Sequence, residues 1–143
     1  MSDRQSNLES VQNLYAAFGR GDLAYILNSC SESVDWGFIG PDTVPYSGRY
    51  SGRGGVEQFF SRLAQSCDIR KFEPRDFIAD ESSVVVTGLE EAVARPTGRA
   101  YQTPWVHVWR IQDGQVVHFR EFSDSYAVAV AFQGIPSPDG VVH

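Results

Sequence analysis

Hydrophobic positions near the start of the chain recur with the period of a helix. They fall at steps of three and four residues, at Leu8, Val11, Leu14, Tyr15 and Phe18, so they share one face of a helix. Gly19 and Gly21 predict the end of that helix. Two shorter helices are predicted over residues 22–27 and 56–63, where large apolar residues repeat in the same way. The N-terminal part of the chain therefore supplies the helices of the fold.

Alternation of apolar and polar residues predicts strands elsewhere. It covers residues 34–38, 72–79, 84–95, 101–111 and 116–123, and a short helix follows over 127–132. Pro74 places its strand at a sheet edge or a bulge, and Asp113-Gly114 is a strong hairpin signal. Because helices precede a run of antiparallel strands, the predicted class is α+β. A curved antiparallel sheet of this kind wraps the helices and leaves a pocket at one end.

The 143 residues fit one domain, long enough to bury a core without a metal or a disulfide. Residues 1–6 are polar and are predicted to be disordered. Residues 133–143 contain Pro136, Pro138 and two glycines, and we expect a flexible C-terminal tail there. The folded domain is expected over residues 7–132.

Charge and motif content narrow the function. The net charge is −6 and the basic residues are scattered, which argues against nucleic acid or an anionic membrane as partner. No apolar leader or membrane span is visible, so we expect a cytoplasmic protein. Cys30 and Cys67 match no metal or redox motif and are expected to be buried thiols. The three histidines lack ligand spacing, so neither a metal nor a cofactor is predicted.

Side chains alternate between the two faces of a strand, so the pairing of the last two strands decides which of their residues face a pocket. A two-residue turn at 113–114 would pair His107 with Arg120, whereas a three-residue loop would pair His107 with Phe119 and Trp105 with Glu121. We favour the longer loop because it leaves Arg120 outside. The inward face would then consist of Trp105, His107, Trp109, Val117, Phe119, Glu121 and Ser123. Such a face, apolar with one imidazole and one carboxylate, is typical of a ligand pocket.

Three local motifs give a resemblance to a known superfamily. They are Phe18-Gly19-Arg20-Gly21-Asp22-Leu23, then the stretch from Tyr46 to Val56 followed by Phe59-Phe60, and finally Trp105-Val106-His107-Val108-Trp109 with residues 120–124. These resemble the nuclear transport factor 2-like superfamily, which includes ketosteroid isomerases and SnoaL-like polyketide cyclases. The resemblance covers about residues 7–132. It implies a cone with a deep apolar pocket, and a homodimer formed through the sheet.

The resemblance also implies an acid–base chemistry. His107 stands where ketosteroid isomerases carry their oxyanion-hole acid, and Glu121 lies near the aspartate base of SnoaL-like cyclases. Apolar surroundings favour a carboxylate as a base, so Glu121 is the expected base and His107 its orienter or the polariser of a carbonyl. We expect a cofactor-independent isomerase, cyclase or lyase that acts on a small hydrophobic carbonyl compound. The isomerase base falls at Phe38, which argues against steroid isomerisation by that mechanism.

Further side chains complete the expected site and leave alternatives open. The candidate substrate-binding residues are Tyr15, Phe18, Trp36, Phe38, Tyr50, Phe59, Trp105, Trp109, Phe119 and Ser123. Asp124 is either a rival base or a helix cap. One of Glu90 and Glu91 must face inward on a regular strand, which would allow an epoxide hydrolase-like pair of carboxyl groups. The alternatives to an enzyme are a non-catalytic binding module and a dimeric protein-interaction domain whose pocket is closed by side chains.

Overall fold

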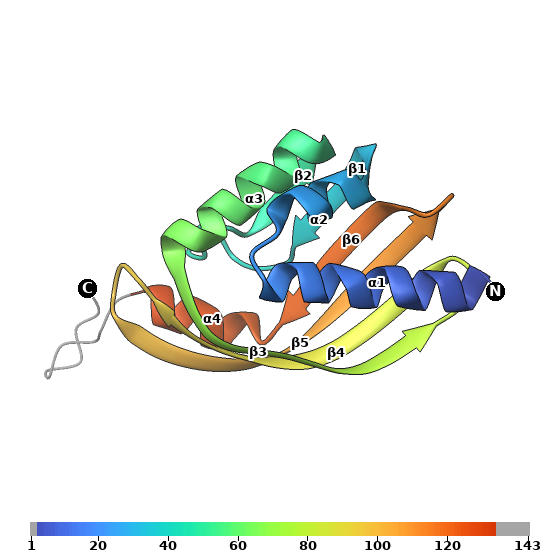
Figure 1. Cartoon of the computed structure of the whole chain (residues 1–143). Helices are drawn as coiled ribbons and strands as arrows, with labels where there is room; N and C mark the ends of the chain where they lie inside the picture. The colour runs from blue at the N-terminus through green and yellow to red at the C-terminus, as the bar shows by residue number, and fades with distance from the viewer. Residues whose placement is uncertain (1–2, 134–143) are drawn as a thin grey trace, which may run out of the picture.

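The computed structural model describes residues 3–133, which form four helices and six strands. The helices are α1 (Asp3–Gly19), α2 (Leu23–Ser29), α3 (Gly52–Ser66) and α4 (Ser125–Phe132). The strands are β1 (Cys30–Phe38), β2 (Gly48–Ser51), β3 (Cys67–Ala79), β4 (Ser83–Ala94), β5 (Arg99–Gln112) and β6 (Gln115–Ser123). Figure 1 shows α1, α2 and α3 on the concave side of a strongly curved sheet. The predicted α+β class is confirmed.

The sheet has the order β2-β1-β6-β5-β4-β3. Its neighbours are antiparallel except for β1 and β6, which run parallel. The sheet is therefore mixed rather than wholly antiparallel as predicted. Parallel pairing is possible here because the chain travels through α3 and four further strands between β1 and β6.

Several boundaries differ from the sequence prediction. Helix α1 begins at Asp3, inside the stretch expected to be irregular. Strand β2 was missed because it has four residues, three of them exposed, in a stretch rich in glycine and proline. Pro74 does lie in an edge strand, β3, and the register shifts between Pro74 and Asp76. The tail predicted for 133–143 lies, from residue 134 on, outside the described residues.

The hairpin between β5 and β6 has a register that neither predicted turn produces. Asp113 and Gly114 form a two-residue turn with positive φ angles of 53° and 76°, and Gln112 pairs with Gln115. A bulge follows, because Ile111 pairs with Val116 while Arg110 pairs with His118. The favoured three-residue register is therefore wrong.

The bulge inserts Val117 as an extra residue and shifts β6 by one position. His107 consequently lies opposite Glu121, and Trp109 lies opposite Phe119. The predicted inward face is thus correct apart from Val117, which is only half-buried; Val116 is buried in its place.

Two other features follow the prediction. Cys30 and Cys67 are both free and buried. Asp124 caps α4 by accepting a hydrogen bond of 3.1 Å from the backbone N–H of Ala127, so the helix-cap alternative holds for this residue. Within residues 3–133, no helix combines the length and the apolar character needed to cross a bilayer.

Candidate functional site

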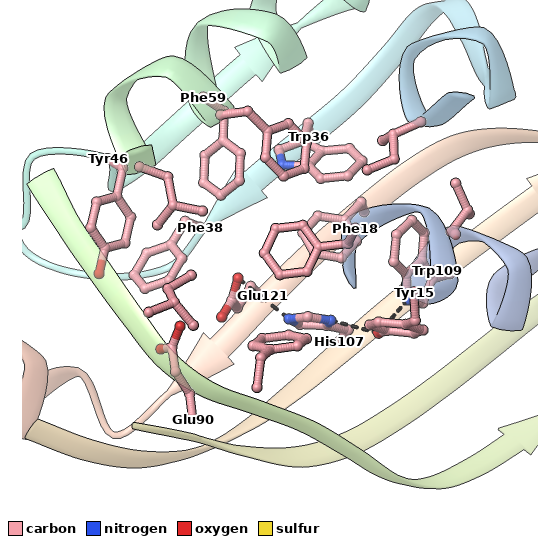
Figure 2. Close-up of a pocket in the computed structure, with 17 residues that line it drawn as sticks. Tyr15, Phe18, Trp36, Phe38, Tyr46, Phe59, Glu90, His107, Trp109 and Glu121 are labelled. Carbon is pink, nitrogen blue, oxygen red and sulfur yellow. Dashed lines mark hydrogen bonds and ion pairs between the residues drawn. The ribbon is translucent and has the colours of Figure 1, made fainter. Parts of the chain in front are cut away.

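A small cavity lies between the concave face of the sheet and helices α1, α2 and α3 (Figure 2). Its volume is about 50 Å³, enough for a few water molecules. Its lining is mostly aromatic and consists of Leu14, Tyr15, Phe18, Ile26, Trp36, Phe38, Tyr46, Phe59, Phe60, Leu63, Ile69, Phe72, Glu90, His107, Trp109, Phe119 and Glu121. None of these described lining residues is a lysine or an arginine. The polar groups of the cavity are therefore acids, hydroxyls, indoles and one imidazole.

Tyr15 of α1 forms the centre of a hydrogen-bond chain at one end of the cavity. Its hydroxyl oxygen lies 2.6 Å from His107 Nδ1 and accepts a hydrogen bond of 3.0 Å from Trp109 Nε1. Burial raises the pKa of Tyr15 far above its usual value, so the hydroxyl keeps its hydrogen. The indole N–H can only donate, so His107 Nδ1 is the acceptor that the described residues offer to the hydroxyl hydrogen. His107 Nδ1 is thus an acceptor, and the ring hydrogen is on Nε2.

Glu121 lies beside the other edge of the same imidazole. The distance from His107 Nε2 to Glu121 Oε1 is 3.3 Å, and the two side chains are 6% and 12% exposed. The direction of the Nε2–H bond falls outside hydrogen-bond geometry, so Nε2 has no aligned acceptor. The order Trp109–Tyr15–His107–Glu121 therefore leaves the Nε2 edge of the imidazole beside the carboxylate, without an aligned hydrogen bond.

Aromatic rings hold the imidazole in place. The ring of Trp105 stacks on the His107 imidazole at a centroid distance of 4.0 Å. The Tyr15 ring is parallel to the same imidazole within 4°. Phe119 meets it edge-on at 4.9 Å. Because these rings enclose the imidazole from several sides, its orientation is fixed by packing as well as by the hydrogen bond from Tyr15.

Glu90 is a second carboxyl group in the cavity. Strand β4 alternates regularly along its pairing with β5, without a bulge at Gly88, so Glu90 faces inward and is 7% exposed. It makes no hydrogen bond or ion pair with any residue between 3 and 133. Burial, and next the negative charge of Glu121, raise the pKa of Glu90 to about 8. Its neighbour Glu91 faces outward beside Lys71.

Most of the predicted pocket residues line the cavity. They are Tyr15, Phe18, Trp36, Phe38, Phe59, His107, Trp109, Phe119 and Glu121. Three others do not. Trp105 lies beneath His107, Tyr50 points its hydroxyl at the carbonyl oxygen of Tyr46, and the Ser123 hydroxyl is buried without a hydrogen bond.

Sequence reasoning missed several lining residues. Leu14, Ile26, Phe60 and Leu63 belong to the apolar helical patterns, and only the relative placement of the helices separates cavity positions from core positions. Ile69 and Phe72 come from the edge strand β3. Tyr46 lies in an irregular loop, where no periodicity indicates its direction.

Comparison with known proteins agrees with this architecture. A sequence model of the SnoaL-like domain matches residues 11–119, so the chain belongs to the SnoaL-like domain family. No protein of curated function matches it significantly.

Three of the solved structures similar to this chain share its fold over nearly their whole length. An NTF2-like protein from Burkholderia xenovorans LB400 is 27% identical, with a TM-score of 0.82 over 90% of this chain and 97% of that one. An NTF2-like protein of unknown function from Burkholderia pseudomallei K96243 is also 27% identical, with a TM-score of 0.80 over 94% and 100%. TerC, co-crystallised with polyporic acid, is 25% identical, with a TM-score of 0.79 over 90% and 99%.

Proposed function

We propose that the protein is a cofactor-independent acid–base enzyme that removes a proton next to a carbonyl group of a small hydrophobic compound. The observation that carries this proposal is the chain Tyr15–His107–Glu121, whose carboxylate end faces an otherwise apolar cavity. Isomerisation, cyclisation and elimination all begin with such a proton transfer. Membership of the SnoaL-like domain family fits this chemistry.

Glu121 serves as the base and His107 as its orienter. The Nδ1 atom of His107 accepts the hydrogen of Tyr15, and its Nε2 side lies against Glu121. Nδ1 is engaged with Tyr15, whereas Nε2 lies beside the carboxylate without an aligned hydrogen bond. Of the two roles expected for this histidine, its position between Tyr15 and Glu121 supports orientation of the base.

Substrate entry requires side chains to move, because the cavity is far smaller than the roughly 300–1,000 Å³ of typical ligand sites. Two grooves on the protein surface lie outside the cavity. Phe18 and Ile69 line both grooves and also the cavity itself. Both residues are half-buried. The Phe18 ring meets the Phe72 ring edge to face and lies tilted against the Phe60 ring. We propose that these rings separate to admit a flat hydrophobic molecule.

The proposal also covers the oligomeric state of the protein and its location in the cell. A homodimer through the outer face of the sheet would cover Phe122, which is 44% exposed and whose neighbours in β6 face inward. We also propose a cytoplasmic location.

A second candidate function is binding without catalysis. The unaligned contact between His107 and Glu121 favours it, because the proposed orienter makes no hydrogen bond to the proposed base. The two functions differ in one respect only, since a binding module would hold a carbonyl compound without exchanging its protons.

The test uses 2-indanone and 2-tetralone, two flat ketones with acidic hydrogens next to the carbonyl. Their stabilisation of the protein is measured by thermal unfolding, and the loss of their α-hydrogens in D₂O by NMR. We expect the wild type to accelerate exchange and Glu121→Gln to lose at least about 100-fold of that acceleration while still binding. Glu57→Gln, on the exposed face of α3, is the matched control.

Each other result has a definite meaning. Stabilisation without any exchange by the wild type would establish the binding module. Equal exchange by wild type and Glu121→Gln would remove Glu121 from its role. If neither ketone, nor polyporic acid as a third probe, raises the melting temperature, the proposal of a small-molecule site is wrong.

A further inference from the structure

The proposed base needs a group that holds the carbonyl oxygen of the substrate. Removal of a proton next to a carbonyl places negative charge on that oxygen, and a hydrogen-bond donor must stabilise it. Tyr15 donates to His107 Nδ1, and His107 Nε2 lies 3.3 Å from Glu121, the proposed base, without an aligned hydrogen bond. The Tyr46 hydroxyl lies 3.1 Å from that of Tyr101, and burial raises the pKa of Tyr46 far above its usual value, so it is a much weaker acid than a carboxyl group. Apart from the His107–Glu121 pair, the described lining groups without a hydrogen-bond partner are the Glu90 carboxyl and the indole N–H of Trp36.

Glu90 enters the cavity at a different point from the His107–Glu121 pair. It pairs with Thr103, four residues before His107 on β5, which is about 13 Å along a strand. Figure 2 shows its carboxyl group directed into the cavity, on the side away from Tyr15. A ligand in the middle of the cavity would therefore have Glu121 on one side and Glu90 on another.

The surroundings of Glu90 keep its carboxyl group neutral. The titratable groups that interact electrostatically with Glu90 are Glu121, Tyr46, Cys67 and Tyr101. None of them is a cation. Cys67 Sγ and the hydroxyls of Tyr101 and Tyr46 contact one another, so they do not take up the Glu90 hydrogen. A buried carboxyl without a positive partner retains its proton. Unlike Trp36, it can also transfer that proton.

Resting on the proposed function, we propose that Glu90 is a further catalytic residue: the neutral acid that protonates the substrate's carbonyl oxygen while Glu121 takes the carbon-bound proton. The electron pair of the broken C–H bond forms the new C=C bond, and the C=O π pair binds the proton from Glu90. An enol results, with Glu121 protonated and Glu90 ionised. Return of the proton from Glu121 to the same or a conjugated carbon, and of the enol proton to Glu90, restores both residues.

This pair also defines the class of substrate. A carboxylate or phosphate ligand would meet Glu121 without a cation among the lining residues to balance it. An amine would instead form an ion pair with a carboxylate and gain from the aromatic lining. The role of Glu90 as an acid requires an uncharged carbonyl compound. The site is thus expected to prefer ketones over both carboxylates and amines of the same shape.

The experiment compares Glu90→Gln with Glu91→Gln, its outward-facing and partly exposed neighbour on β4. Exchange of 2-indanone protons is measured from pH 6 to pH 10 together with the melting temperature of each variant. We expect wild type and Glu91→Gln to lose activity as the pH rises through about 8, where Glu90 ionises. Glu90→Gln should be slower by about tenfold or more below pH 8 and should lack this decline. Binding is compared for 2-indanone, 2-aminoindane and indane-2-carboxylate.

The outcomes separate this inference from the proposed function. If Glu90→Gln keeps the wild-type rate and the decline above pH 8 while Glu121→Gln is inactive, Glu90 has no catalytic role although the proposed function stands. A loss of about tenfold or more in Trp36→Phe, while Glu90→Gln keeps the wild-type rate, would assign the oxygen to the indole and overturn the inference. Tighter binding of 2-aminoindane than of 2-indanone would show a site for organic cations. If wild type exchanges nothing, the proposed function itself fails.

Discussion

The indole ring of Trp105 lies directly over the backbone of Gly88, its pairing partner on β4. A Cβ atom at position 88 would overlap the indole ring and the carbonyl oxygen of Glu73 on β3. Glycine thus lets a large ring lie flat on the concave surface of the sheet. That ring in turn supports His107 at a stacking distance of 4.0 Å, so the absence of a side chain on β4 positions the imidazole on β5.

Gly88→Ala should destabilise the protein because Trp105 or β3 must shift to make room. Overpacking of this kind costs about 1–3 kcal/mol. Gly54→Ala is the control, since its Cβ would meet no atom within 4 Å and alanine favours a helix by up to about 1 kcal/mol. Urea unfolding of both variants measures the difference. Equal stabilities would show that Trp105 does not depend on Gly88.

Tyr15→Phe should weaken both the fold and the site. The phenylalanine ring preserves the packing but leaves Trp109 Nε1 without an acceptor and His107 Nδ1 without a donor. Leaving buried polar groups unsatisfied costs about 1–3 kcal/mol. Tyr25→Phe, at a ring that is 37% exposed, should change stability little. A Tyr15→Phe protein as stable as the wild type would contradict the hydrogen-bond chain.

Glu90 should make stability depend on pH. Its pKa rises from 4.5 to about 8 in the folded protein, so between these values the folded state binds more protons than the unfolded state. Stability therefore falls as the pH rises from about 4.5 to 8, by at most about 5 kcal/mol, and this contribution changes no further above that range.

Replacement of Glu90 should remove this dependence. Glu90→Gln is expected to be more stable than wild type at pH 9, because the amide is never ionised in the buried site. Glu91→Gln keeps Glu90 and should follow the wild-type pH profile. Chemical unfolding of the three proteins at pH 5, 7 and 9 provides the comparison. Parallel profiles for all three would mean that Glu90 is ionised or solvated in the folded protein.

The inward-facing residues of β5 and β6 could be predicted because side chains alternate along a strand. His107, Trp109, Phe119 and Glu121 were assigned to one face on that basis, and they share it. The register could not be predicted, since the bulge at Val117 has no distinctive sequence. Apart from Val117, the inward face was still predicted correctly, because the expected three-residue loop and the observed bulge both place Glu121 on the same face of the sheet as His107.

Contacts between elements far apart in the chain could not be predicted from the sequence. Tyr15 and His107 are 92 positions apart, and the direction of the hydrogen in their bond depends on Trp109 as a third partner. The inward direction of Glu90 depends on a regular β4 without a bulge at Gly88, and that regularity goes with the packing of Trp105 on Gly88, which a local pattern does not reveal. Local pattern indicates which residues face inward, whereas the chemistry of the site depends on how helices and strands meet.

The orientation of the His107 ring is the most direct test of the central claim, that Tyr15 turns the imidazole N–H toward Glu121. Nitrogen-15 NMR of the histidine rings, assigned with a His107→Gln variant, reports which nitrogen carries the hydrogen. We expect the neutral His107 ring to be protonated on Nε2, with Nδ1 accepting from Tyr15. A ring protonated on Nδ1 would mean that His107 donates to Tyr15 and presents a bare nitrogen to Glu121, which would contradict its role as orienter of the base.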